Sequence, residues 1–252
     1  MQYLCDVKKF LFSVLNALAV LMLLTSCSDK YTIVGTSMHS VFDGKMVYIS
    51  SMIDSKNASL DSCEIIHGQF TMSGPLDSVM CVTLDMGDFH LPLVLESGEI
   101  RVSSEYQTVK VEGTELNDIL YKFLTTRDSL IMILTDLPRR ESQMILEGYD
   151  HDYIMHTLGE AEADVRIAMD RLETNFIVDN FNNVLGVSWF MEICNETYQR
   201  FGYPNTTPQI DEIYSMAPDE FRQNVNVKKF KQARVNGGSN YDSLKVAKCL
   251  VI

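Results

Sequence analysis

The sequence predicts an α+β fold, with an antiparallel β-meander or sandwich-like domain at residues 31–113 and a helical domain at residues 114–235. Before Gly113, short segments alternate apolar and polar residues between glycine-containing turns, as half-buried strands do. After Gly113, apolar residues recur every three or four positions, as on one face of a helix. Hydrophobic residues make up 46% of the chain, which is enough for a packed core.

The first 26 residues have the order of a secretory signal peptide. Lys8 and Lys9 precede an apolar run at residues 10–24, and small residues follow it. As a helix this run would be about 22 Å long at roughly 1.5 Å per residue, short of the roughly 30 Å hydrocarbon core. We therefore expect residues 1–26 to be removed and not to remain as a membrane span.

The end of this leader, Leu24-Thr25-Ser26-Cys27, resembles the bacterial lipobox. The resemblance implies cleavage between Ser26 and Cys27 and acylation of the Cys27 thiol. Residues 27–30 would then be a lipidated tether. Each acyl CH₂ buried in the bilayer stabilises such an anchor by about 0.8 kcal/mol, so two or three chains hold firmly.

The chain is acidic, with a formal net charge of −13. Removing the leader takes away two lysines and one aspartate, which changes the net charge from −13 to −14. Such a body is repelled by nucleic acid phosphates and anionic lipid head groups. We expect no nucleic acid partner, and contact with the membrane through the lipid on Cys27.

The cysteines show no catalytic or metal-binding spacing. Apart from Cys5 in the leader and Cys27, the chain has four: Cys63, Cys81, Cys194 and Cys249. None forms a CxxC pair, and the intervals are wide and irregular, unlike a disulfide framework or a zinc site. We expect buried free thiols.

The expected strands lie at residues 31–34, 45–51, 63–65, 70–72, 79–86, 89–95, 100–102 and 109–112. A two-residue turn at positions 67 and 68 would pair Ile65 with Phe70 and Cys63 with Met72, which gives one apolar face and a core-facing cysteine.

A turn at Ser97-Gly98 would pair Leu95 with Ile100 and Leu93 with Val102, with Val94 and Arg101 pointing outward. Pro92 cannot donate a ladder hydrogen bond, so its strand begins there, lies at an edge or has a bulge. The resulting meander has one apolar face, which we expect the helices to cover.

The helical part begins with a helix from Thr114, a possible N-cap, to about residue 135, and Pro138 is expected to interrupt it. Residues 141–176 follow as two helices or a bent one, because Gly148 and Gly159 weaken the pattern.

Residues 184–198, with Trp189, form a third helix that we expect at the centre of the helical part. Further helices open at Pro208, at Pro218 and at residues 227–235. A short tail at residues 236–252 begins with a flexible linker.

Five stretches resemble a known but uncharacterised β-rich domain: Tyr31-Thr-Ile-Val-Gly35, Asp43-Gly-Lys-Met-Val-Tyr48, His67-Gly-Gln-Phe70, Leu93-Val-Leu-Glu-Ser-Gly98 and Val111-Glu-Gly-Thr114. That domain stands, behind a lipoprotein signal, at the N-terminus of bacterial thioredoxin-like thiol-disulfide oxidoreductases. Residues 180–189 and 208–223 resemble the helical spacer before their thioredoxin domain. The chain departs from them at Ile252, where it ends without a CxxC pair, so no catalytic residue carries over. The resemblance also implies an outer-membrane location.

Two other clusters contain residue types that are found in metal or acid/base sites. Glu147, His151 and His156 could suggest a metal site, but His156 lies off the face that the other two share, so a solvated helix face is favoured. A second cluster surrounds a Gly87 turn and is interpreted as turn formers, not as acid/base chemistry: Asp85, Asp88 and His90.

We therefore expect a membrane-anchored lipoprotein whose body is a non-catalytic binding or scaffolding module, without a cofactor and with an envelope protein as partner. The alternatives are the docking or accessory half of a thiol-disulfide exchange system, or a truncated oxidoreductase that has lost its thioredoxin domain. The first hypothesis predicts an exposed apolar groove or patch.

Overall fold

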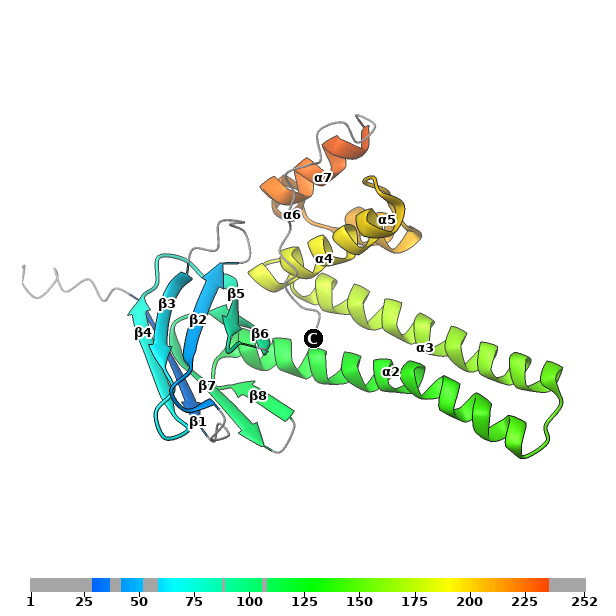
Figure 1. Cartoon of the computed structure of the whole chain (residues 1–252). Coiled ribbons are helices and arrows are strands. Elements are labelled where there is room, and N and C mark those ends of the chain that lie inside the picture. Colours follow the sequence, from blue (N-terminus) through cyan, green and yellow to red (C-terminus); the bar gives the residue numbers. More distant parts are fainter. Residues whose placement is uncertain (1–28, 37–41, 52–58, 88, 106–107, 236–252) are drawn as a thin grey trace, which may run out of the picture.

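The computed structural model describes residues 29–36, 42–51, 59–87, 89–105 and 108–235, and Figure 1 gives their arrangement. The predicted signal peptide, the Ser26–Cys27 cleavage site and the tail at residues 236–252, which includes Cys249, lie outside this range. Strands come first and helices follow, so the predicted α+β class is confirmed.

The strands form two four-stranded sheets. The first sheet has the order β4(Phe70–Pro75), β1(Lys30–Thr36), β7(Gly98–Glu105) and β8(Thr108–Glu112). The second has the order β3(Ser59–Glu64), β2(Met46–Ser51), β5(Met80–Asp85) and β6(His90–Leu95). All pairs are antiparallel except β1 with β7, which are parallel. The arrangement is thus a sandwich and not a single meander.

The apolar faces of the two sheets cover each other. Ile33 and Ile100 from the first sheet and Ile49 and Leu84 from the second are fully buried in one shared cluster. The expectation that helices cover this face is therefore wrong. A second sheet performs that role, because alternation in a strand shows that one face is buried without showing what buries it.

The predicted turn at His67-Gly68 forms, but the ladder beyond it does not. Both residues have positive φ, and Ile66 and Gln69 exchange backbone hydrogen bonds of 2.9 and 3.1 Å across the turn. Past this bridge, β3 pairs with β2 and β4 pairs with β1, so the chain crosses between sheets. The predicted strand pairing is therefore wrong. Ile65, Phe70 and Met72 are buried as predicted, because both sheets face the same core, whereas Cys63 is only half-buried.

The Ser97-Gly98 turn also connects the two sheets. Leu95 pairs with Met80 in the second sheet, whereas Ile100 pairs with Ile33 in the first. The predicted pairing of Leu95 with Ile100 is therefore wrong. Pro92 lies in the edge strand β6, as one of its three predicted placements required.

Val94 points out of the sandwich, as predicted, but it is fully buried because it belongs to the helical core. It marks the place where the helices pack against β6. The free edge of β6 is closed there by Asn117, whose Oδ1 accepts from the Val94 N–H at 2.9 Å and whose Nδ2 donates to the Val94 carbonyl at 2.8 Å. Asn117 thus takes the place of a neighbouring strand.

The first two helices form an antiparallel hairpin, α2(Glu115–Leu146) and α3(His151–Asp179). Pro138 lies inside α2, so the predicted interruption there is wrong. A proline inside a helix destabilises it, in part because one backbone hydrogen bond is lost. Packing of α2 against α3 can stabilise the helix by more than this loss. The break comes instead at Gly148, whose φ of 82° favours glycine, and Gly159 is tolerated within α3.

The remaining helices are α4(Val184–Phe201), α5(Pro208–Met216), α6(Asp219–Gln223) and α7(Val225–Val235). Trp189 on α4 is 1% exposed, and its ring meets Phe123 of α2 at 4.6 Å between centroids, so the predicted central position of α4 is confirmed.

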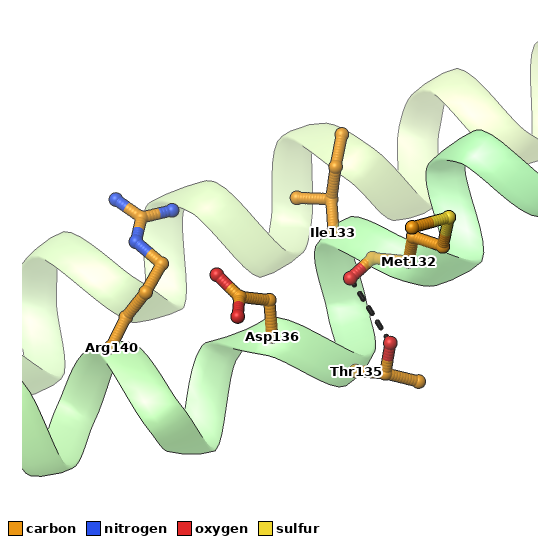
Figure 2. Close-up of a pocket in the computed structure, with 5 residues that line it drawn as sticks. All are labelled: Met132, Ile133, Thr135, Asp136 and Arg140. Atoms are coloured by element: carbon orange, nitrogen blue, oxygen red, sulfur yellow. Dashed lines mark hydrogen bonds between the residues drawn. The ribbon is translucent and has the colours of Figure 1, made fainter.

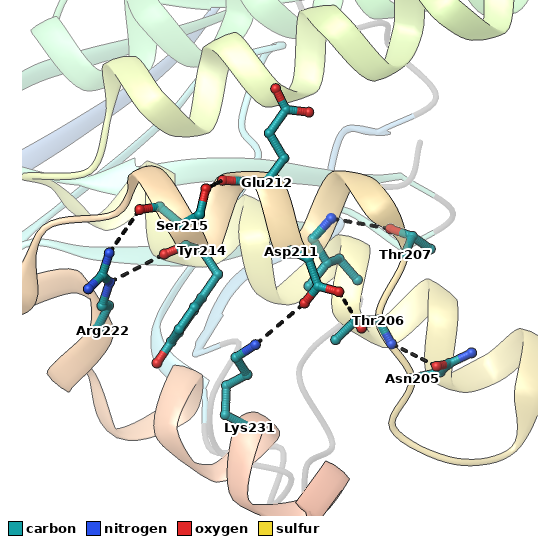
Figure 3. A network of polar contacts seen from close by, with 10 residues as sticks. Asn205, Thr206, Thr207, Asp211, Glu212, Tyr214, Ser215, Arg222 and Lys231 are labelled. Atoms are coloured by element: carbon teal, nitrogen blue, oxygen red, sulfur yellow. Dashed lines mark hydrogen bonds and ion pairs between the residues drawn. The ribbon is translucent and has the colours of Figure 1, made fainter.

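Polar contacts tie α5, α6 and α7 together (Figure 3). Arg222 donates to the Tyr214 and Ser215 carbonyls at the end of α5, while Lys231 lies 4.0 Å from the Tyr214 ring centroid and 3.6 Å from Asp211. A cation is favourable at a helix C-terminus, so Arg222 holds α6 against the end of α5, while the contacts of Lys231 hold α7 against the same helix.

Candidate functional site

The α2–α3 hairpin projects from the rest of the molecule (Figure 1). On α2 the buried side chains end at Leu124, although the helix continues to Leu146. On the outer part of α3, the buried residues are Ile154, Leu158 and Val165, one stripe at helical spacing. Each outer helix therefore has one helical neighbour, and much of its surface faces solvent.

Large apolar side chains are exposed at the end of this hairpin. Leu146 is 87% exposed and Ile145 59%, both in the last turn of α2. Tyr149 and Tyr153 stack on each other with centroids 5.5 Å apart and planes 19° apart. Together with Met155 these residues are called the hairpin tip. An apolar side chain gains about 1.5–3 kcal/mol when it is buried, so the tip is an exposed apolar patch of the kind that the binding hypothesis predicts.

Local hydrogen bonds give the tip a defined backbone. The Gly148 N–H donates to the Ile145 carbonyl at 3.1 Å, and the Tyr149 N–H to the Met144 carbonyl at 3.1 Å, which closes α2. Asp150 then caps α3 by accepting from the Asp152 N–H at 3.0 Å. These hydrogen bonds define the backbone of the connection from which Tyr149 and Tyr153 project.

Negative charge lies at the tip and along the adjoining turns of both helices. Residues 141–165 contain no lysine or arginine and seven acidic residues, here called the acidic belt: Glu141, Glu147, Asp150, Asp152, Glu160, Glu162 and Asp164. Arg166 binds Glu162 at 2.6 Å, and His156 lies 3.4 Å from Glu160. Among the described residues, the other five have no basic side chain within 4.0 Å. Most of the belt's charge is therefore open to a partner.

A shallow hollow follows α2 between the tip and the body, and all its lining residues belong to α2: Met132, Ile133, Thr135, Asp136 and Arg140 (Figure 2). Met132 is 70% exposed. The hydrogen bonds from Arg139 hold the pKa of Asp136 below its usual range. This carboxylate stays ionised and bound, so the hollow offers apolar contact and not acid/base chemistry.

The base of the hairpin is fixed by a buried ion pair. Arg127 Nε lies 3.1 Å from Glu173 Oε1, and the two side chains are 13% and 10% exposed. The guanidinium also lies 5.2 Å from the Trp189 ring. Burial raises the pKa of Glu173, while the hydrogen bond from Arg127 opposes that shift. This contact joins α2, α3 and α4 at one point.

The structure places the candidate metal ligands Glu147, His151 and His156 at the exposed tip. In the described parts of the chain, no group of three His, Cys, Asp or Glu side chains is arranged to hold a metal ion. Asp85 accepts from the Gly87 N–H at 2.9 Å and lies 3.4 Å from His90, as a turn former does; Asp88 lies outside the described residues.

The described cysteines are the free thiols Cys63, Cys81 and Cys194. Cys194 is buried as predicted, whereas the other two are only half-buried. Burial raises the pKa of each thiol, that of Cys81 to about 11, although Ser188 donates a hydrogen bond to its sulfur at 3.2 Å. At pH 8 only about one Cys81 in a thousand would be a thiolate, which is the reactive form. None of the three is poised for disulfide exchange.

The comparisons with known proteins concern the sandwich. Residues 31–120 match the family model described as a domain of unknown function (DUF4369). The DUF4369 match covers a little over a third of the chain, and it ends just after Asn117, the residue that closes β6. No curated protein and no solved structure matches the chain.

The hairpin tip lies outside the DUF4369 match, and sequence reasoning missed it. The helical pattern over residues 141–176 does not distinguish exposed from buried apolar positions, and it favours a solvated face for Glu147 and His151. The sequence does contain a signal, because two aliphatic residues and two tyrosines lie on either side of Gly148 in a stretch without lysine or arginine. Their exposure could be recognised only once the hairpin was seen to extend beyond the core.

Proposed function

We propose that this protein is a lipid-anchored envelope protein that works as a non-catalytic binding module, with the α2–α3 hairpin as its docking arm. The observation that carries the proposal is the exposure of the hairpin tip at the end of a long projection. Leu146 and Ile145 remain exposed to water in the folded chain, so burying them against a partner would stabilise the complex.

The geometry of the chain suits such a role. With Cys27 as the acylated N-terminus, residues 27–29 would reach at most about 11 Å, so the sandwich would lie close to the bilayer. β1 begins beside the end of β4, on the side of the sandwich remote from the hairpin (Figure 1). α2 is about 48 Å long at roughly 1.5 Å per residue, so the tip would extend away from the membrane.

The lipid on Cys27 is the proposed membrane attachment, and the outer membrane its proposed location. Across the described residues, no helix combines the length and apolarity that crossing a bilayer requires.

Site-specific photocrosslinking in cells tests the docking arm. A photoreactive amino acid at position 146 should yield a crosslinked protein adduct. The same amino acid at Val225, 64% exposed on α7, should not. Equal yields from both positions, or no adduct from position 146, would refute the hairpin as a docking arm.

A second candidate function is the accessory half of a thiol-disulfide exchange system. It is favoured by the DUF4369 match, which overlies the stretches that resemble the N-terminal domain of lipoprotein oxidoreductases. Under this hypothesis the partner supplies the reactive thiols, because burial raises the pKa of the Cys81 and Cys194 thiols and makes them poor nucleophiles. The purified protein should then not reduce a model disulfide by itself, and fast exchange would rule out the accessory role.

A further inference from the structure

We propose that the hairpin tip binds a basic, apolar polypeptide segment of a partner protein, one that presents lysine or arginine beside aliphatic or aromatic side chains. This inference rests on the proposed docking function and names the chemistry of the occupant. It follows from three properties of the tip: its charge, its aromatic pair and its exposed aliphatic residues.

The charge of the tip selects a cationic occupant. Within the acidic belt, Glu141, Glu147, Asp150, Asp152 and Asp164 have no basic neighbour within 4.0 Å among the described residues, and no lysine or arginine follows Arg140 until Arg166. A partner that brings basic side chains would therefore meet uncompensated carboxylates on both helices. Complementary charge of this kind raises association rates and excludes wrong partners.

The aromatic pair offers a second contact for cations. Tyr149 and Tyr153 are both exposed, and their rings stack 5.5 Å apart. A guanidinium or ammonium group over a tyrosine face is attracted by the ring quadrupole, most often when the cation is arginine. Asp150 and Asp152 lie between these tyrosines in the chain, so the same short segment supplies both aromatic rings and carboxylates.

The aliphatic residues of the tip add the apolar requirement. Ile145 and Leu146 precede the tyrosines, and they are 59% and 87% exposed. A purely charged peptide would leave them in water, whereas a segment with apolar side chains would bury them. Interfaces of this type place an apolar centre inside a polar rim.

The same features argue against two other occupants. An anionic membrane would face the acidic belt, which has no lysine or arginine to meet the head groups. A second copy of the hairpin would bring two acidic belts together, and like charges across an interface are unfavourable.

A labelled peptide tests the proposed chemistry. The probe is a fluorescent amphipathic peptide of about 18 lysine, leucine and tryptophan residues, with a glutamate-for-lysine version as its control. Fluorescence anisotropy with the full-length lipidated protein in a non-ionic detergent should show binding of the lysine peptide alone. Raising the salt from about 0.1 M to about 1 M shortens the Debye length from about 10 Å to about 3 Å and should weaken this binding.

Matched variants locate the binding. Glu147→Gln with Asp152→Asn should weaken binding of the lysine peptide roughly threefold to tenfold, because each exposed charge contributes modestly. Asp77→Asn with Glu220→Gln removes the same charge elsewhere and should change it less than twofold. Leu146→Ser should weaken binding without changing the net charge. Equal effects of the two charge pairs, or no effect of Leu146→Ser, would overturn the proposal.

The position-146 crosslink separates this inference from the docking function. Sequencing the crosslinked peptide by mass spectrometry should identify a basic segment with apolar residues. The inference would be overturned by a crosslink to an acidic or neutral segment, to a second copy of this chain or to a lipid. A crosslink to an acidic or neutral protein segment would still support the docking arm. No crosslink at all would instead refute the docking arm itself.

Discussion

Replacing Asn117 with alanine removes the side chain that closes the free edge of β6. Asn117 is fully buried, and its amide satisfies both the N–H and the carbonyl of Val94 and also donates to Thr114 Oγ1 at 2.8 Å. Val94 and Asn117 are both 0% exposed, so alanine would leave two buried backbone groups of Val94 without partners. Each such group costs about 1–3 kcal/mol, which gives a loss of about 2–6 kcal/mol in the free energy of unfolding.

That loss is large beside a total stability of about 5–15 kcal/mol. Chemical denaturation should show it directly, and at roughly 2–4 °C per kcal/mol the Tm should fall by about 4 °C or more. Asn175→Ala, an exposed change on α3, is the matched control and should stay within about 0.5 kcal/mol. The interpretation of Asn117 as a substitute strand would be refuted if both alanines cost the same, or if the Val94 amide kept its protection from hydrogen exchange.

Three further predictions concern separate parts of the molecule. Burial and the Asp61 hydrogen bond raise the pKa of Tyr31 from 10.0 to about 12. Stability linked to this phenol is therefore complete below pH 10 and lost as the pH rises toward 12, and Tyr31→Phe should flatten that alkaline decline in denaturant titrations. Leu146→Ser should leave the unfolding free energy within about 0.5 kcal/mol, whereas Leu120→Ala in the core should cost about 2–5 kcal/mol; similar losses would mean that the tip is packed. Cys27→Ala should abolish labelling by a fatty-acid probe, and persistent labelling would contradict the lipobox assignment.

The sequence predicted whether each segment is a strand or a helix better than it predicted which elements lie side by side. The alternation in β4 correctly indicated that Phe70 and Met72 are buried, and Pro208 correctly marked the start of α5, where Thr207 accepts from the Ile210 N–H. Both are local properties. Which strand lies beside β4 depends on β1, about forty residues earlier in the chain, and no local pattern carries that information.

The errors in the helical part have a similar origin. Pro138 disfavours a helix locally, but α2 is held along its length by α3, and that contact appears only in the folded chain. Asn117 is an ordinary polar position in the helical pattern, and its role depends on Val94 in another element. The hairpin tip was missed because apolar residues at helical spacing look the same whether a core covers them or not.

Two buried polar contacts at the base of the hairpin hold it in one orientation. Asn117 joins α2 to β6, and the Arg127–Glu173 pair joins α2 to α3 beside Trp189. From Arg127 to Leu146 the helix is about 29 Å long, so a rotation of about 5° at its base would move the tip by about 2.5 Å. A displacement of that size would separate a tip side chain from a partner atom in contact with it. Directional polar contacts at the base resist such rotation better than apolar packing alone, because they specify one geometry. An arm that is already oriented loses less freedom on binding, so a small tip can contribute more of its contact energy to affinity.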